Sequence, residues 1–274
     1  GNSKDWFESG FIRTFATLAI VGSAAYAGAW LSIEYGLPWW GMVGVGSVVG
    51  LLFGVVIAIP AMRLEGFYYA LLTIAFGQVL WFIAIKWHTV TGGEDGLQGV
   101  PRGKLLGLLD LESDTALYFV VLAVFVAVFL FIVRVVHSPF GQVLKAIREN
   151  EPRAVSLGYD VDKYKLLAFV LSTTLAGLAG SLKTMVLGFA TLSDAHWSLS
   201  GEVVLMTLLG GMGTFAGPVI GAFTIIGLQN FLADRVGAWV TVIIGGIFVV
   251  CVIGFRRGFV GELLEWQRRR QRAK

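Results

Sequence analysis

The feature that most constrains the fold is a series of long, continuous apolar runs. We count about eight runs of roughly 20 residues, the length at which a helix crosses about 30 Å of hydrocarbon. The runs do not alternate apolar with polar residues, which favours helices over a β-barrel. Hydrophobic residues make up 56% of the 274 residues and charged residues only 14%. The sequence therefore predicts an all-α integral membrane protein, a polytopic helical bundle whose expected spans cover residues 12–33, 40–60, 67–87, 116–136, 166–188, 198–215, 216–234 and 238–256.

The distribution of basic residues orients this bundle. Lys and Arg are retained on the cytoplasmic side of membrane proteins. If residues 137–165 are cytoplasmic and eight helices span, both termini are cytoplasmic as well, and 88–115 is the longest outer loop. An Arg-rich tail at residues 268–274 then faces the cytoplasm, where it either binds membrane-lipid headgroups or contacts a partner. Of the 21 Lys and Arg residues, this orientation leaves only five at or near the outer face: Lys86, Arg102, Lys104, Lys183 and Arg235.

A polar and basic hairpin separates the fourth and fifth expected spans. Ser138 is a good helix N-cap, and Pro139 suits the first helical position. The residues that follow predict one amphipathic helix along the membrane surface. Its apolar face has the spacing i, i+3, i+4, i+7, in Phe140, Val143, Leu144 and Ile147, and its polar face holds Gln142, Lys145, Arg148 and Glu149.

A second, shorter helix follows in the same hairpin. Asn150 can cap it, Pro152 lies in its first turn, and Gly158 ends it. Asp162 offers an N-cap for the next apolar run, which starts at Leu166. The short helix is thus predicted to hang between two spans with apolar side chains on a cytoplasmic surface, which indicates docking of a partner: Ala154, Val155 and Leu157.

Glycines at a spacing of four form two further groups. Gly46, Gly50 and Gly54 share one face of the second span, and Gly213, Gly217 and Gly221 share one face at the junction of the sixth and seventh spans. Small residues at this spacing let helix backbones approach closely. Helix packing is favoured over direct substrate contact for both groups. The segment 198–215 could be a half-helix that dips into the membrane, but the loss of one span would put the Arg-rich tail outside, which argues against it. The segment from Gly210 to Ala222 adds Pro218 and a Gly pair that loosen the helix, and broken helices at membrane depth line cavities or pathways. The candidate pathway or helix-packing residues are Gly92, Gly93, Gly96, Gly210, Gly211, Gly213, Gly217, Pro218 and Gly221.

The outer loop gives no sign of a metal or nucleotide site. Its segment TGGEDGLQGVP specifies turns, and we interpret the loop as a structured lid or docking surface. Glu94 and Asp95 supply too few oxygen ligands for calcium. The chain has no HExxH, CxxC or GxSxG motif, so we predict no catalytic residue, no metal and no cofactor in this chain.

Two ionisable residues near outer span ends allow two interpretations. Lys183 can extend to the headgroups while Glu202 stays hydrated. Alternatively, the two side chains form an ion pair across the fifth and sixth spans, which would fix the turn between them. The sequence leaves both alternatives open.

Three stretches together resemble the permease subunit of ABC importers for branched-chain amino acids, specifically the second of the two paired permease types. The first is RLEGFYYALLTIAFGQVL with the TGGEDGL that follows it. The second runs from Phe140 to Leu182, and the third is GEVVLMTLLGGMGTFAGPVIGA. Together they cover much of residues 60–255, and their order and spacing make the resemblance specific. The resemblance is weaker at the amino end, where GSAAYAGAW only faintly matches the family's Gly-rich stretch.

The resemblance implies a transport subunit rather than an enzyme, with residues 1–274 forming one transmembrane permease domain in a bacterial inner membrane. The hairpin would contain the family's coupling segment, whose pattern appears here as Glu151, Ala154 and Gly158. That segment would sit in a cleft of a cytoplasmic ATPase. The implied partners are a paralogous permease, two ATPase subunits that carry ATP and Mg, and a periplasmic binding protein, with no nucleic acid. The ATPase-coupling residues are then Glu151, Pro152, Ala154, Val155, Leu157 and Gly158.

Alternative functions stay open. Related permeases carry urea, short amides or other amino acids, and a sugar or vitamin permease has a similar architecture. An ion-coupled secondary transporter would also have broken Gly-rich helices, but it would be expected to hold a buried acidic residue at a span centre. Because the chain begins Gly1, Asn2, Ser3 without Met, we expect further residues upstream.

Overall fold

The computed structural model describes residues 22–61, 67–100, 104–105, 109–110, 113–191, 196–211, 216–236, 242–243 and 245–246. Those residues are overwhelmingly helical, which confirms the all-α class. Three described helices are long and apolar enough to cross a membrane, at Trp39–Pro60, Asp114–His137 and Val161–Leu187. The chain is thus a multi-pass membrane protein. Its residues divide into two units, 1–200 and 201–274, and the boundary falls within one helix.

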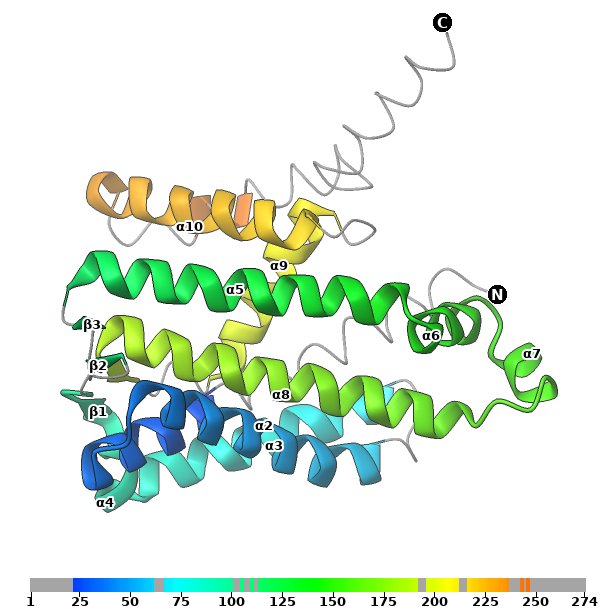
Figure 1. The fold of residues 1–274 in the computed structure, drawn as a ribbon, viewed down its shortest axis with the longest axis horizontal. Coiled ribbons are helices and arrows are strands. Elements are labelled where there is room, and N and C mark those ends of the chain that lie inside the picture. The colour runs from blue at the N-terminus through cyan, green and yellow to red at the C-terminus, as the bar shows by residue number, and fades with distance from the viewer. Residues whose placement is uncertain are drawn as a thin grey trace, which may run out of the picture. The chain divides into compact units, whose positions relative to one another are not determined.

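The first unit is built from long helices that run beside one another (Figure 1). A helix at residues 22–35 is followed by α2 (Trp39–Ala61) and α3 (Phe67–Lys86), and further along come α5 (Asp114–His137) and α8 (Val161–Leu187). Short elements lie at the two opposite ends of these helices. At one end are α6 (Pro139–Glu149) and α7 (Glu151–Ser156), and at the other α4 (His88–Thr91), the 3-10 turn η1 (Gly93–Asp95), β1 (Leu97–Gln98) and β4 (Phe189–Ala190).

Helices α2 and α8 pack through small residues. The predicted face of Gly46, Gly50 and Gly54 lies against Thr173, Gly177 and Ser181 of α8. A Cβ on Gly46 would overlap Ser181, and one on Gly54 would overlap Thr173. Close helix packing is therefore confirmed for this group, and Thr173 and Ser181 are fully buried in the contact.

Two small antiparallel ladders occur between the helices. In the first, Leu97 of β1 pairs with Ala190 of β4. In the second, Lys104 of β2 (Lys104–Leu105) pairs with Asp110 of β3 (Leu109–Asp110). The β1–β4 ladder ties the loop after α4 to the chain that leaves α8.

In the second unit, α9 (Trp197–Gly210) is followed by α10 (Gly217–Val236). The expected span 198–215 is interrupted, because α9 ends at Gly210 and Gly211 has a φ of 108°. A helix of 14 residues is about 21 Å long, short of the ~30 Å of a bilayer core. This geometry fits the half-helix alternative. Within this unit a Cβ on Gly221 would overlap the carbonyl of Met206, and one on Gly210 would overlap Gly217, so the two helices pack closely.

Candidate functional site

Three side-chain caps divide the hairpin into three helices. Ser138 Oγ accepts a hydrogen bond from Gly141 N at the start of α6, and Asn150 Oδ1 accepts one of 3.1 Å from Arg153 N at the start of α7. Both caps were predicted from the sequence and are confirmed. Asp160 Oδ1 accepts from Lys163 N and caps α8.

The predicted cap at Asp162 is wrong. Helix α8 begins at Val161, earlier than the expected 166, because Asp160 takes the capping position. Val161 is buried there against Ile147 of α6 and Ala154 of α7. Burial of this side chain fixes the start of the helix before the membrane-spanning apolar run begins.

A small apolar core holds the hairpin together. Ile147, Ala154 and Val161 are buried, with Val143 and Tyr164 packed against them. The Tyr164 ring stacks on Phe140 at 5.6 Å and meets Tyr159 edge-on at 6.1 Å. Ala154 is only 2% exposed, so this residue of the predicted docking surface contacts its own chain. Its small side chain lets α7 lie close to α6 and α8.

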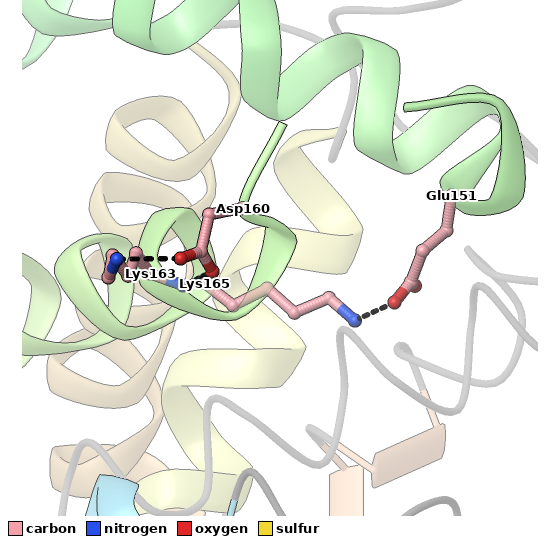
Figure 2. A network of polar contacts seen from close by, with 4 residues as sticks. All are labelled: Glu151, Asp160, Lys163 and Lys165. Carbon is pink, nitrogen blue, oxygen red and sulfur yellow. Dashed lines mark hydrogen bonds and ion pairs between the residues drawn. The ribbon is translucent and has the colours of Figure 1, made fainter. Parts of the chain in front are cut away.

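Two ion pairs connect the polar side chains of the hairpin (Figure 2). Lys165 Nζ lies 2.5 Å from Glu151 Oε1 and joins α8 to the first residue of α7. Lys163 Nζ lies 2.7 Å from Asp160 Oδ2, within the first turn of α8. The hydrogen bond from the Lys163 side chain lowers the pKa of the Asp160 carboxyl below its usual value, with smaller contributions from the backbone bond and the positive charge.

Three of the predicted coupling residues are exposed on α7 and its C-terminal end, and we call them together the α7 face: Pro152, Val155 and Leu157. Val155 is 57% exposed and Leu157 68% exposed, and Pro152 is also exposed. Gly158 has a φ of 86° and follows Leu157, the C-cap of α7, as the predicted helix end requires. A short capped helix thus presents apolar side chains to the outside of the hairpin.

The opposite end of the first unit carries the glycine-rich loop. Gly92, Gly93 and Gly96 have positive φ, and a Cβ on Gly96 would overlap the carbonyl of Ala190. Thr91 Oγ1 donates a hydrogen bond to the Ala84 carbonyl oxygen of α3, which holds the loop on the end of that helix, and it also lies 2.9 Å from the Trp87 carbonyl oxygen. This packing fits the interpretation of a structured surface.

A cavity of about 450 Å³ opens beside the β1–β4 ladder. Asp95 and Gln98 come from the loop, and Gly188 and Phe189 from the end of α8. A carboxylate, an amide and an aromatic ring thus lie around one opening.

The other predicted residues lie in or near the second unit. Helix packing in that unit involves Gly210, Gly217 and Gly221. Gly211 follows α9, and Pro218 lies in the first turn of α10. Gly213 lies outside the described residues. Glu202 Oε1 accepts a hydrogen bond from Gln229 Nε2 of α10. Lys183 is exposed near the end of α8. Its pairing with Glu202 stays a prediction.

Sequence patterns did not reveal Lys165 or Gln229 as functional candidates. Lys165 and Glu151 are 14 residues apart, and Gln229 and Glu202 are 27 apart, so no helical spacing links either pair. Among the described residues, no group of three His, Cys, Asp or Glu could hold a metal ion.

The comparison with protein families decides the family of the chain. A family described as "Branched-chain amino acid transport system / permease component" matches residues 12–252. The chain belongs to this permease family. The match includes the hairpin, the glycine-rich loop and both helices of the second unit described above.

Individual relatives agree with the family. The high-affinity branched-chain amino acid transport system permease protein LivM of Escherichia coli (strain K12) is 27% identical over 86% of this chain and 60% of its own length. A probable branched-chain amino acid transport permease protein LivM of Methanocaldococcus jannaschii is 26% identical over 64% of the chain and 50% of its length. The autoinducer 2 import system permease protein LsrC of Salmonella choleraesuis is 28% identical over 85% of the chain and 66% of its length. The chain thus spans about 60% of the length of the E. coli relative. No solved structure matches the chain.

Proposed function

We propose that this chain is the transmembrane permease subunit of an ATP-driven ABC importer that moves branched-chain, hydrophobic amino acids across the inner membrane. The observation that carries the proposal is the exposed α7 face on a capped, well-anchored hairpin, in a chain of this permease family. The relatives named for branched-chain amino acid transport support the substrate class.

The α7 face suits a cytoplasmic ATPase partner. Apolar side chains on a short helix fit a groove and become buried on docking. Two ATPase states that bind α7 with different affinity would shift the spans between conformations, so the driving chemistry lies on ATP and Mg in the partner chains. In this proposal the chain itself carries no catalysis.

The full importer in this proposal holds a paralogous permease, two ATPase subunits and a periplasmic binding protein. The hairpin and both chain termini lie on the cytoplasmic side, as the positive residues favour. The glycine-rich loop and the cavity beside it then lie on the periplasmic side. That side would receive the substrate from the binding protein.

A second candidate is import of an autoinducer 2-like signal molecule. It is favoured by the LsrC relative, whose name gives that substrate and which aligns over 85% of this chain. Both candidates share the ATPase docking and differ in the transported molecule.

Copurification tests the docking role. The tagged intact chain would be purified from native membranes, and ATP hydrolysis in the purified material would be measured. We expect an ATPase with the wild type and its loss with Leu157→Asp, because a carboxylate at this exposed apolar position cannot be buried in an apolar groove without a partner. Gln142→Asp is the matched control, since it adds the same charge to an exposed position of α6. A wild type that purifies without an ATPase contradicts the proposal.

A further inference from the structure

The contact between Lys165 and Glu151 connects α7 to α8, the longest helix in the part of the chain that the structure describes. We propose that Lys165 is a positioning residue that makes α7 and α8 move as one rigid unit. A displacement of α7 is then transmitted along α8 to the cavity at the opposite end of this helix. This inference rests on the proposed docking of α7 to an ATPase. It assigns a role in transport to a residue that touches neither the docked partner nor the substrate.

Helix α7 is attached to the rest of the hairpin at two places. Ala154 packs into the hairpin core, and Glu151, three residues earlier, is held by Lys165. The Lys165 side chain is only 23% exposed, so much of its aliphatic stem is covered while its ammonium reaches a carboxylate that is 48% exposed. A pair this accessible to water contributes little to stability. Its consequence is geometric: the intact pair restricts the rotation of α7 on Ala154.

The helix between the two ends can carry a displacement. Helix α8 has 27 residues and no proline, so it is an uninterrupted rod of about 40 Å. Its side packs backbone to backbone on α2 around Gly177, which resists bending. Figure 1 shows α8 running from the hairpin to the end that carries β1.

The opposite end of α8 forms part of the cavity wall. Gly188, which ends α8, and Phe189, which begins β4, both line the cavity. The Gly188 carbonyl also accepts a hydrogen bond of 3.0 Å from Val100 N, and β4 pairs with β1. A shift of α8 along its axis therefore moves one wall of the cavity together with the glycine-rich loop.

The chain offers a matched control for Lys165. Lys163 is two residues earlier on the same helix, and its side chain is 76% exposed. It pairs with Asp160 at the start of its own helix and makes no connection to α7 (Figure 2). Lys165→Met and Lys163→Met remove the same charge, but only the first removes the connection between α7 and α8.

The transport experiment uses the complete importer in liposomes with leucine as the probe. Leucine molecules moved per ATP hydrolysed would be measured for both Met variants and for Lys165→Arg. We expect the ratio to fall about fivefold or more in Lys165→Met, the lower range of measured coupling between sites. Lys163→Met and Lys165→Arg should keep the wild-type ratio. A loss of assembly alone would lower total uptake but leave this ratio unchanged.

A distance measurement separates this inference from the proposed function. Nitroxide labels at Val155 and Leu167, both exposed, would report the α7–α8 geometry in the full membrane-inserted chain with Cys251→Ser. We expect one narrow distance distribution for the wild type and Lys163→Met, and a broadened one for Lys165→Met. An unchanged distribution in Lys165→Met, or a wild-type transport ratio in that variant, overturns the inference. A wild type without any ATPase contradicts the proposed function instead.

Discussion

Gly50 of α2 and Gly177 of α8 face each other so closely that a Cβ on Gly50 would lie 3.2 Å from the Gly177 Cα. Helices in lipid gain little from the hydrophobic effect, so backbone approach of this kind supplies the packing attraction between them. The same contact supports α8 along its side between the hairpin and the cavity at its opposite end.

Gly50→Ala should destabilise the protein. The added methyl would lie 2.5 Å from the Thr173 carbonyl oxygen, and overpacking of this kind costs about 1–3 kcal/mol. Thermal unfolding of the detergent-solubilised chain would show a lower Tm. Gly44→Ala is the control, because a Cβ at this exposed position of α2 meets nothing within 4 Å. Equal Tm values for the two variants would mean that α2 and α8 do not pack as described.

Gly158→Val should weaken ATPase docking while membrane insertion stays intact. Gly158 has a φ of 86°, where a β-branched residue is strained by roughly 1–2 kcal/mol, and its strain would shift the end of α7. The measurement is ATPase copurified per inserted chain. Gly158→Asn should retain more docking, because Asn tolerates this conformation. Unchanged transport in Gly158→Val would count against a role for this helix end.

Gly96→Ala should open the glycine-rich loop more than Gly99→Ala. Both glycines have positive φ, at 70° and 74°, so both substitutions strain the backbone, and Gly96 also has a ψ of −177°, a region that essentially only glycine adopts. Only at Gly96 would the methyl overlap the Ala190 carbonyl, next to the β1–β4 ladder. Hydrogen exchange of the Gln98 and Val100 amides reports the opening. If exchange is equally fast in both variants, the close contact at Gly96 does not hold the loop.

Asp160 should titrate below the usual Asp pKa of 3.8, because its bonds to Lys163 favour the charged form. With a lowered folded-state pKa, the stabilisation is complete above 3.8 and is lost as the pH falls through the lowered value. Carboxyl NMR of the chain in micelles gives the midpoint. In Lys163→Met the midpoint should rise toward 3.8. A midpoint that is the same in both proteins would exclude this interaction.

Local patterns predicted the local features of the hairpin and of α2. Capping residues such as Ser138 and Asn150 act on amides three residues away, so the sequence alone reveals them. The glycine face at Gly46 to Gly54 was visible for the same reason, through its spacing. Its partner on α8, and the connection from Lys165 to Glu151, depend on how distant segments meet in space. No spacing rule covers such pairs.

The predicted docking surface also shows what local sequence patterns cannot predict. A run of apolar residues predicted Ala154, Val155 and Leu157 as one surface. In the structure Ala154 lies in the hairpin core while Leu157 faces outward. The pattern gave the apolar character of the helix, but the packing of α6 and α8 decides which side chains remain exposed.

The most direct test of the whole account is uptake of labelled leucine by liposomes that contain the copurified importer, with ATP enclosed and the binding protein outside. We predict uptake that requires ATP and the binding protein, is competed by valine and isoleucine, and is insensitive to urea or autoinducer 2. Uptake that continues without ATP and follows an ion gradient, or competition by autoinducer 2 in place of valine, would contradict the account.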